Sequence, residues 1–127
     1  MKKIIHTPSA PEPIGPYSQA TVAGDMLFIS GQIAIDPATQ QYVPQGVKEE
    51  ALLAMSNLRA ILSAAGCDFR HVVKSSIFLA DMNDFPVVNE VYGSFFQGDF
   101  PARETVQVSV LPKNSKVEIS MIAQVPS

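Results

Sequence analysis

The sequence predicts an α+β fold in which a mixed β-sheet carries two α-helices on one face. Two segments have the three-and-four residue spacing of amphipathic helices, and the segments around them alternate apolar with polar residues, as strands do. The expected element order is ββαβαββ, and right-handed crossovers would put both helices on the same side of the sheet. At 127 residues the chain is long enough for one hydrophobic core and too short for two, so we expect a single domain over residues 1–127.

The N-terminal part is expected to begin as an extended arm. Residues 6–16 contain four prolines, which exclude a helix or an inner strand. Residues 19–23 and 26–35 have the character of strands, and the Gly24-Asp25 pair between them is typical of a tight hairpin. Residues 36–46 are rich in Pro, Gln and Thr, and we expect them to form a loop.

The clearest helix is predicted over residues 47–65. Its apolar positions follow the spacing of a buried stripe: Ala51, Ala54, Met55, Leu58, Ile61, Leu62 and Ala65. Gly66 supplies a natural end to this helix. Residues 71–80 then contain the β-branched residues of a strand.

The C-terminal part is expected to contain a second helix and two strands. Asn83 or Asp84 can cap a helix that runs to about Phe96, because a proline in the first turn is tolerated. The strands are predicted over residues 102–111 and 116–124, on either side of a Pro-Lys-Asn turn.

Strand alternation predicts which side chains share a face of the sheet. In the strand after the second helix, Val106 and its alternating valines are expected to meet the helices, which puts Arg103 and Thr105 on the open face. The same rule puts Ser30 and Glu118 on the open face. Because charged residues are scarce, we expect this face to lie at a subunit boundary of a homo-oligomer.

Composition excludes several classes of protein. The net charge of −3 and the pI near 5.2 argue against nucleic acid or an anionic membrane as a partner. A single cysteine excludes an intrachain disulfide, and the two histidines are too isolated to suggest a metal site. No stretch approaches the roughly 20 apolar residues that span a bilayer, so we expect a cytoplasmic protein. The common nucleotide-binding and serine-hydrolase motifs are absent.

Arg103 is the first candidate for chemistry, because it follows a proline at the start of a strand. A guanidinium there can hold a carboxylate through two parallel hydrogen bonds, although pairing with Glu104 on the surface is the alternative. Glu118 is a second candidate, or else an exposed strand carboxylate. Tyr17 either lines a pocket or packs the arm. The residues alone indicate a carboxylate-binding pocket and no more.

Ser30 and Gly31 lie next to each other within a predicted strand. A glycine there marks a β-bulge or allows a ligand to approach the backbone closely.

Four runs in order resemble the reactive intermediate deaminase family, called Rid or YjgF-type: IGPYSQA (14–20), ISGQI (29–33), FPARETVQV (100–108) and LPKNSKVEI (111–119). The runs NLRAILSAAG and MNDFPVVNEVYGSFF resemble the two helices of that family, so the resemblance covers essentially the whole chain. It implies a chorismate-mutase-like fold, a homotrimer, and clefts that lie between subunits.

The resemblance also implies an activity. Members similar to the archetypal branch hydrolyse 2-imino acids such as 2-iminobutanoate and 2-iminopropanoate to 2-oxo acids and ammonia. It carries over Arg103 as the anchor of the substrate carboxylate and Glu118 as the residue that positions water. Tyr17, Ser30 and Gly31 would line the pocket, with the backbone near Thr105 holding the substrate. An imine is already electrophilic, so no metal or organic cofactor is expected.

The sequence departs from the family at three positions and leaves two other functions open. Glu104-Thr105 stands where many members have Ser-Cys, and Ser120 replaces a glutamate that is frequent in the family. Strand alternation indicates that Glu104 points away from Arg103. The alternatives are a non-catalytic trimer that binds 2-oxo acids, and an RNA-directed ribonuclease or translation inhibitor. The acidic balance of charge argues against the RNA-directed activity.

Overall fold

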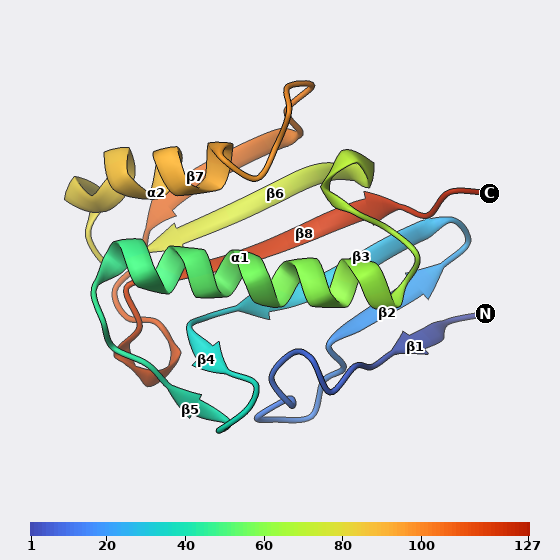
Figure 1. Ribbon diagram of the computed structural model, residues 1–127, viewed down its shortest axis with the longest axis horizontal. Helices are drawn as coiled ribbons and strands as arrows, with labels where there is room; N and C mark the ends of the chain where they lie inside the picture. Colours follow the sequence, from blue (N-terminus) through green and yellow to red (C-terminus); the bar gives the residue numbers. More distant parts are fainter.

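In the computed structural model, which describes residues 1–127, both helices lie against the same face of a six-stranded sheet (Figure 1). The spatial order of the strands is β1-β2-β3-β8-β6-β7. Their bounds are β1 Lys3–Ile5, β2 Ala20–Ala23, β3 Met26–Gln32, β6 Val72–Leu79, β7 Ala102–Gln107 and β8 Val117–Gln124. Only β6 and β7 pair in parallel, so the sheet is mostly antiparallel, with β7 at one edge and β1 at the other.

The predicted helices are confirmed as α1 (Val47–Ala64) and α2 (Phe85–Gly93). Gly66 has a φ of +75°, a left-handed conformation that suits glycine and ends α1. Helix α2 ends at Gly93 and so is shorter than the prediction. The core lies between the helices and the sheet. Its largest fully buried apolar side chains are Leu27, Met55, Leu58, Ile61, Leu62, Ile77, Leu79, Ile119 and Met121.

Three short strands were not expected. Strand β1 pairs with β2 from within the first five residues of the chain. Strands β4 (Ile35–Asp36) and β5 (Gln41–Tyr42) form a small separate hairpin, which begins at the last residue of the strand predicted over 26–35 and continues into the predicted loop. Strand β7 ends at Gln107, short of the predicted end, because its partner β6 ends at Leu79, the residue aligned with Gln107.

The face predicted for Arg103 and Thr105 is wrong. In the parallel ladder they align with Ser75 and Ile77, which are fully buried beneath the helices, so Arg103 and Thr105 also face the helices. The prediction assumed that Val106 was buried. Val106 is 42% exposed, because it lies on the opposite face of the sheet, which neither helix covers.

The open-face prediction holds for the other strands. Phe28 and Ile122 are aligned across β3 and β8, and Glu118 is aligned with Phe78 of β6. Glu104 also lies on this open face and so points away from Arg103, as alternation predicted. The Nζ of Lys74 lies 3.0 Å from the Glu104 carboxylate, which also accepts a hydrogen bond from Ser76. Glu104 is therefore paired with side chains of the adjacent strand β6.

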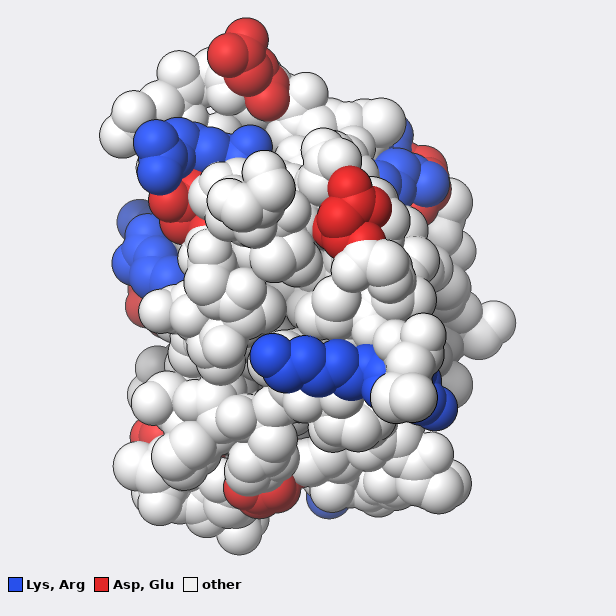
Figure 2. Space-filling view, turned by 90° about the vertical axis from the view of Figure 1, so that its right-hand side faces the viewer, with Lys and Arg blue, Asp and Glu red and all other residues white.

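The surface carries few charges. On the face shown in Figure 2, Lys, Arg, Asp and Glu side chains are scattered among uncharged ones, with no continuous basic stripe. No helix has the length and apolar character that crossing a membrane requires.

Candidate active site

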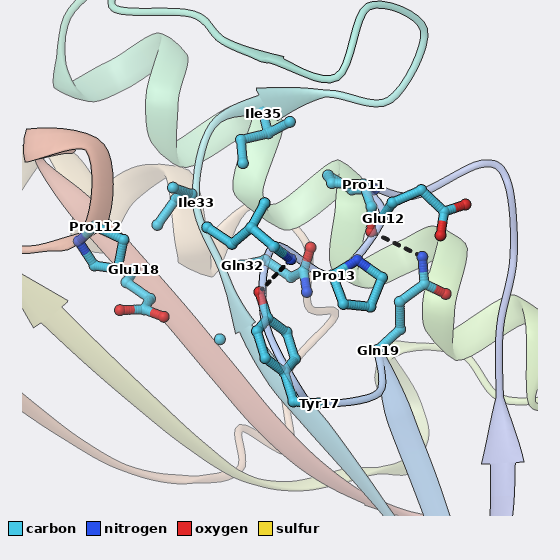
Figure 3. Close-up of a pocket in the computed structure, with 12 residues that line it drawn as sticks. Pro11, Glu12, Pro13, Tyr17, Gln19, Gln32, Ile33, Ile35, Pro112 and Glu118 are labelled. Atoms are coloured by element: carbon cyan, nitrogen blue, oxygen red, sulfur yellow. Dashed lines mark hydrogen bonds between the residues drawn. The ribbon is translucent and has the colours of Figure 1, made fainter.

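Three of the predicted site residues line one cleft. Tyr17 comes from the proline-rich arm, Gly31 from β3 and Glu118 from β8, and Pro112 closes one end (Figure 3). Tyr17 and Glu118 lie on the two sides of this cleft, so a small molecule between them would contact both. Ser30 lines a neighbouring hollow with Tyr17 and Phe28.

Gly31 allows the Glu118 carboxylate to lie directly against the backbone of β3. A Cβ atom at position 31 would lie 2.8 Å from Cδ of Glu118 and would overlap its Oε2. The pairing of β3 with β8 shifts register between Ile29 and Gln32, which is a β-bulge. The two interpretations of Ser30-Gly31, a bulge and a close approach, therefore both apply, and the group that approaches belongs to the protein itself.

Glu118 is suited to accept a proton. Burial raises the pKa of its carboxyl above the ordinary value, because a desolvated carboxylate is disfavoured. None of the ion pairs or hydrogen bonds of the structure involves its side chain. A partly desolvated carboxylate with free oxygens is a better base for water than an exposed one.

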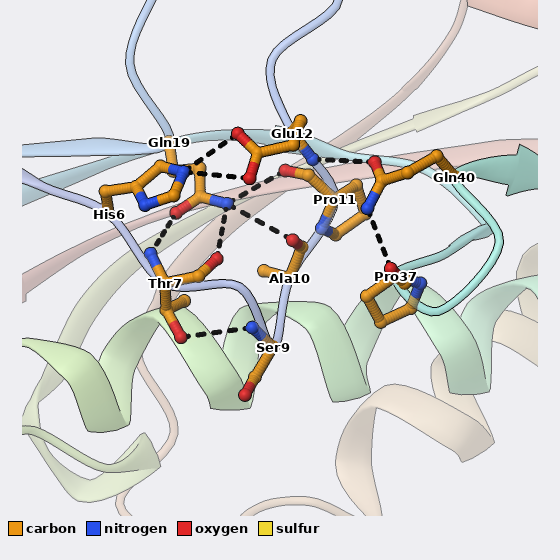
Figure 4. A network of polar contacts seen from close by, with 9 residues as sticks. All are labelled: His6, Thr7, Ser9, Ala10, Pro11, Glu12, Gln19, Pro37 and Gln40. Carbon is orange, nitrogen blue, oxygen red and sulfur yellow. Dashed lines mark hydrogen bonds and ion pairs between the residues drawn. The ribbon is translucent and has the colours of Figure 1, made fainter.

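The arm that carries Tyr17 is held by a buried glutamine, Gln19, which is only 1% exposed. Its Oε1 accepts a hydrogen bond from Thr7 N at 2.7 Å. Its Nε2 donates to the carbonyl oxygens of Thr7, Ala10 and Pro11 at 3.0, 3.3 and 2.9 Å (Figure 4). Sequence reasoning missed this residue, although a glutamine at an otherwise apolar strand start was the available signal.

Ser30 and Tyr17 are tied to the same arm. The Ser30 hydroxyl donates to the carbonyl oxygen of Ser18 at 2.7 Å, and Ser30 N donates to Gln19 O at 2.9 Å. The Tyr17 hydroxyl accepts from Ile14 N at 3.2 Å. Ser30 therefore joins the arm to β3 at the residues next to Tyr17.

Arg103 lies elsewhere, on the edge strand β7. Its Cζ is 5.0 Å from the ring centroid of Tyr92 and 5.7 Å from that of Phe85, both on α2. No carboxylate pairs with it, and no hydrogen bond of the structure uses its guanidinium. Phe100 and Arg103 line a second cleft, separate from the one that contains Glu118. Close by in β7, Thr105 has a buried hydroxyl oxygen without a hydrogen-bond partner.

One chain does not bring the two groups of predicted residues together. Strand β6 separates β8, which carries Glu118, from β7, which carries Arg103, so the lateral distance between them is roughly 10 Å at about 4.8 Å per strand. Arg103 and Thr105 also lie on the helix face, whereas Glu118 lies on the open face. Arg103 and Glu118 are therefore separate within the chain.

Comparisons with known proteins give a consistent picture. The family described as Endoribonuclease L-PSP matches residues 7–125. The chain is 54% identical over 123 residues to the 2-iminobutanoate/2-iminopropanoate deaminase of Mus musculus, covering 97% of this chain and 91% of that protein.

Solved structures are equally similar. The crystal structure of E. coli TdcF with bound serine has a TM-score of 0.92 and 44% identity, covering 98% of this chain and 99% of that one. RidA from an Antarctic Psychrobacter has a TM-score of 0.94 and 41% identity, with 97% and 99% covered. These alignments cover nearly the whole chain, including the residues of both clefts, so the similarity includes the candidate site.

Proposed function

The chain belongs to the Rid family, the family described as Endoribonuclease L-PSP, and on that premise we propose that it is a 2-iminobutanoate/2-iminopropanoate deaminase. The reaction adds water to the C=N bond of a 2-imino acid and releases a 2-oxo acid and ammonia. Identity of 54% to a protein that bears this name, over 97% of the chain, supports the assignment. The whole chain, residues 1–127, would act as one such domain in the cytoplasm.

The active site is assembled from two subunits of a homotrimer. Arg103 and Thr105 of one subunit would face Tyr17, Gly31 and Glu118 of the next. The observation that carries this proposal is that a single chain keeps the unpaired Arg103 on an edge strand, away from the Glu118 cleft. The cavity volume of that cleft is about 40 Å³. A single water needs roughly 10–15 Å³ on this measure, so the cleft of one subunit holds only a few waters.

The residues divide the reaction between them. Arg103 holds the substrate carboxylate in two hydrogen bonds, which fixes the C=N bond relative to Glu118. Glu118 accepts a proton from water as the oxygen bonds to C2, and it returns this proton to the imine nitrogen. The resulting carbinolamine loses ammonia as the C–N bond breaks and the C=O bond forms. The raised pKa of Glu118 favours the uptake of this proton.

Mixed trimers test the two-subunit site. Arg103→Ala and Glu118→Gln homotrimers should each lose nearly all activity. In trimers assembled from equal amounts of both, a site keeps its arginine with a chance of about one half and its glutamate with the same chance, so about a quarter of wild-type activity should return. Release of 2-oxobutanoate from imine generated by a dehydratase measures this. No recovery in verified mixed trimers would overturn the two-subunit site.

A non-catalytic trimer that binds 2-oxo acids is the first alternative. It predicts Arg103-dependent binding of 2-oxobutanoate with no acceleration of imine hydrolysis. The same dehydratase-coupled assay decides between the two functions. Imine hydrolysis that is no faster with the protein than without it would exclude the deaminase activity.

An RNA-directed activity is the second alternative, and the description of the family as an endoribonuclease is what keeps it open. The net charge of −3 and the scattered charges of Figure 2 do not favour it. A functional RNA surface would give affinity that falls steeply as salt rises. Cleavage of RNA that is lost in Arg103→Ala would support this activity instead.

A further inference from the structure

Helix α2 presents two aromatic rings to the proposed carboxylate anchor. Phe85 is the first residue of α2 and Tyr92 follows seven residues later, so both side chains lie on the same face of the helix. The Arg103 guanidinium carbon lies 5.7 Å from the Phe85 ring centroid and 5.0 Å from that of Tyr92. Both distances are within the roughly 6 Å over which a cation is attracted to a ring face.

Contact with ring faces leaves the donors of the guanidinium unused. Its five N–H groups lie in the plane of the group, and two of them can meet a carboxylate edge to edge. A carboxylate from the protein would compete with the substrate for these donors, whereas an aromatic ring does not. Arg103 makes no ion pair in the structure, in contrast to Arg70, which pairs with Asp68 at 2.8 Å.

Tyr92 is itself held in place from the sheet. It is 4% exposed, and its hydroxyl donates a hydrogen bond of 2.8 Å to the hydroxyl of Ser75, which is fully buried. Ser75 in β6 is the residue aligned with Arg103 in β7. Burial raises the pKa of Tyr92, the largest effect on it, so the phenol stays neutral beside the guanidinium. A phenolate there would bind Arg103 as an ion pair and weaken its hold on substrate.

We propose that Phe85, Tyr92 and Ser75 are positioning residues for Arg103. The faces of the two rings hold the guanidinium, and the Tyr92–Ser75 hydrogen bond fixes the nearer ring, so that the unpaired N–H groups are ready for the carboxylate of the imino acid. This inference rests on the proposed function, because it assumes that Arg103 anchors the substrate. It does not involve the proton transfer at Glu118.

Anchoring acts equally on the bound substrate and the transition state, so loss of the rings should raise KM and leave kcat nearly unchanged. We expect Phe85→Leu to raise KM for the imine, and the Kd of 2-oxobutanoate, about five- to tenfold, with kcat within about twofold. Tyr92→Phe keeps the ring and loses only the hydrogen bond, so its KM should rise about two- to threefold.

Phe95→Leu is the matched control. It removes a ring whose centroid lies 5.0 Å from the Cζ of Arg59, a distance equal to that between Tyr92 and Arg103. It should lower the thermal stability and leave KM within about twofold of wild type. A KM for Phe85→Leu that stays at the level of Phe95→Leu would overturn the proposal.

A double-mutant cycle separates this inference from the proposed function. In an Arg103→Ala background, Phe85→Leu should change the Kd of 2-oxobutanoate by less than about twofold, because the rings act only through the guanidinium. An unchanged five- to tenfold effect there would contradict a positioning role. If Arg103→Ala alone leaves activity and binding intact, the proposed function fails first, whatever Phe85→Leu does.

Discussion

The two halves of the proposed site are held by different interactions. In the anchor half, a charged group is fixed by side chains: rings from α2 support Arg103, and Ser75 supports one ring. In the base half, a charged group is fixed by backbone: Glu118 lies against Gly31, and the arm beside it is held through its carbonyls. The residues of the anchor half are Arg103, Phe85, Tyr92 and Ser75, and those of the base half are Glu118, Gly31, Tyr17 and Gln19.

This difference predicts how each half responds to mutation. A side chain that supports another side chain can be trimmed in steps, so the anchor half should lose affinity gradually as its rings are altered. A carboxylate that lies directly against a backbone must move when a methyl group is added to that backbone, because the two cannot occupy the same space. The base half should therefore fail abruptly at single positions that carry no chemistry themselves.

Loss of the anchor gives the largest expected effect. We expect Arg103→Ala to lower kcat/KM on the order of 1,000-fold, since removing one partner of a charge-assisted pair costs about 2–5 kcal/mol. Arg59→Ala is the control, because Arg59 contacts two rings at 5.0 and 5.7 Å, as Arg103 does, but lies on α1. Its kcat/KM should stay within about twofold. Equal losses in the two variants would mean that the stacking, and not the site, explains the effect.

Much of the fold could be predicted because its main elements carry their own local patterns. The stripe of α1 and the hairpin at Gly24 are local signals, and both are present. Strand β1 and the β4–β5 hairpin could not be predicted in the same way. Each is only two or three residues long and exists because of a partner strand, which no periodicity reports.

For the candidate site, the sequence could suggest residues but not how they are arranged. Alternation put Glu104 and Arg103 on opposite faces, which is confirmed, yet it put Arg103 on the wrong one. Which face of an edge strand is covered depends on the elements that pack beside it, here α2. The role of Gln19 could not be predicted either, because it depends on the arm folding back over β2.

Gly31→Ala tests the base half directly. The added Cβ would overlap the Glu118 carboxylate, which must then move by about 1 Å or more. A displacement of this size can cost about 100-fold, so we expect kcat to fall by that factor while Arg103-dependent binding of 2-oxobutanoate stays within about threefold. Single-turnover kinetics and calorimetry measure the two quantities.

The same substitution in a Glu118→Ala background should have little further effect, because the shorter side chain leaves room for the methyl group. An equal loss there would mean that Gly31 matters for its backbone and not for its contact with Glu118.

Gln19→Leu tests whether the arm belongs to the base half. The substitution leaves four backbone hydrogen-bonding groups without their partner, and we expect the free energy of unfolding to fall by about 2–3 kcal/mol. The displaced Tyr17 should also raise KM about threefold. Urea denaturation and steady-state kinetics measure these effects. Gln124→Ala removes a single exposed hydrogen bond to Asp25 and should change stability by less than about 0.5 kcal/mol. If the two variants had the same free energy of unfolding and the same KM, the arm would not belong to the base half.

The smallest effect concerns the pH dependence of stability in the base half. Burial raises the pKa of Glu118 in the folded protein above its ordinary value of 4.5, so the ionised carboxylate opposes folding near neutral pH. Glu118→Gln should therefore be inactive yet slightly more stable than wild type at pH 7. As pH falls through the raised pKa, wild-type Glu118 becomes protonated and recovers this stability, so the difference in Tm should shrink towards pH 4.

The anchor half has no such group, and Arg103→Gln should show a difference in Tm that does not vary over this range. A Glu118→Gln difference that is constant from pH 4 to pH 7 would contradict a desolvated base in the cleft.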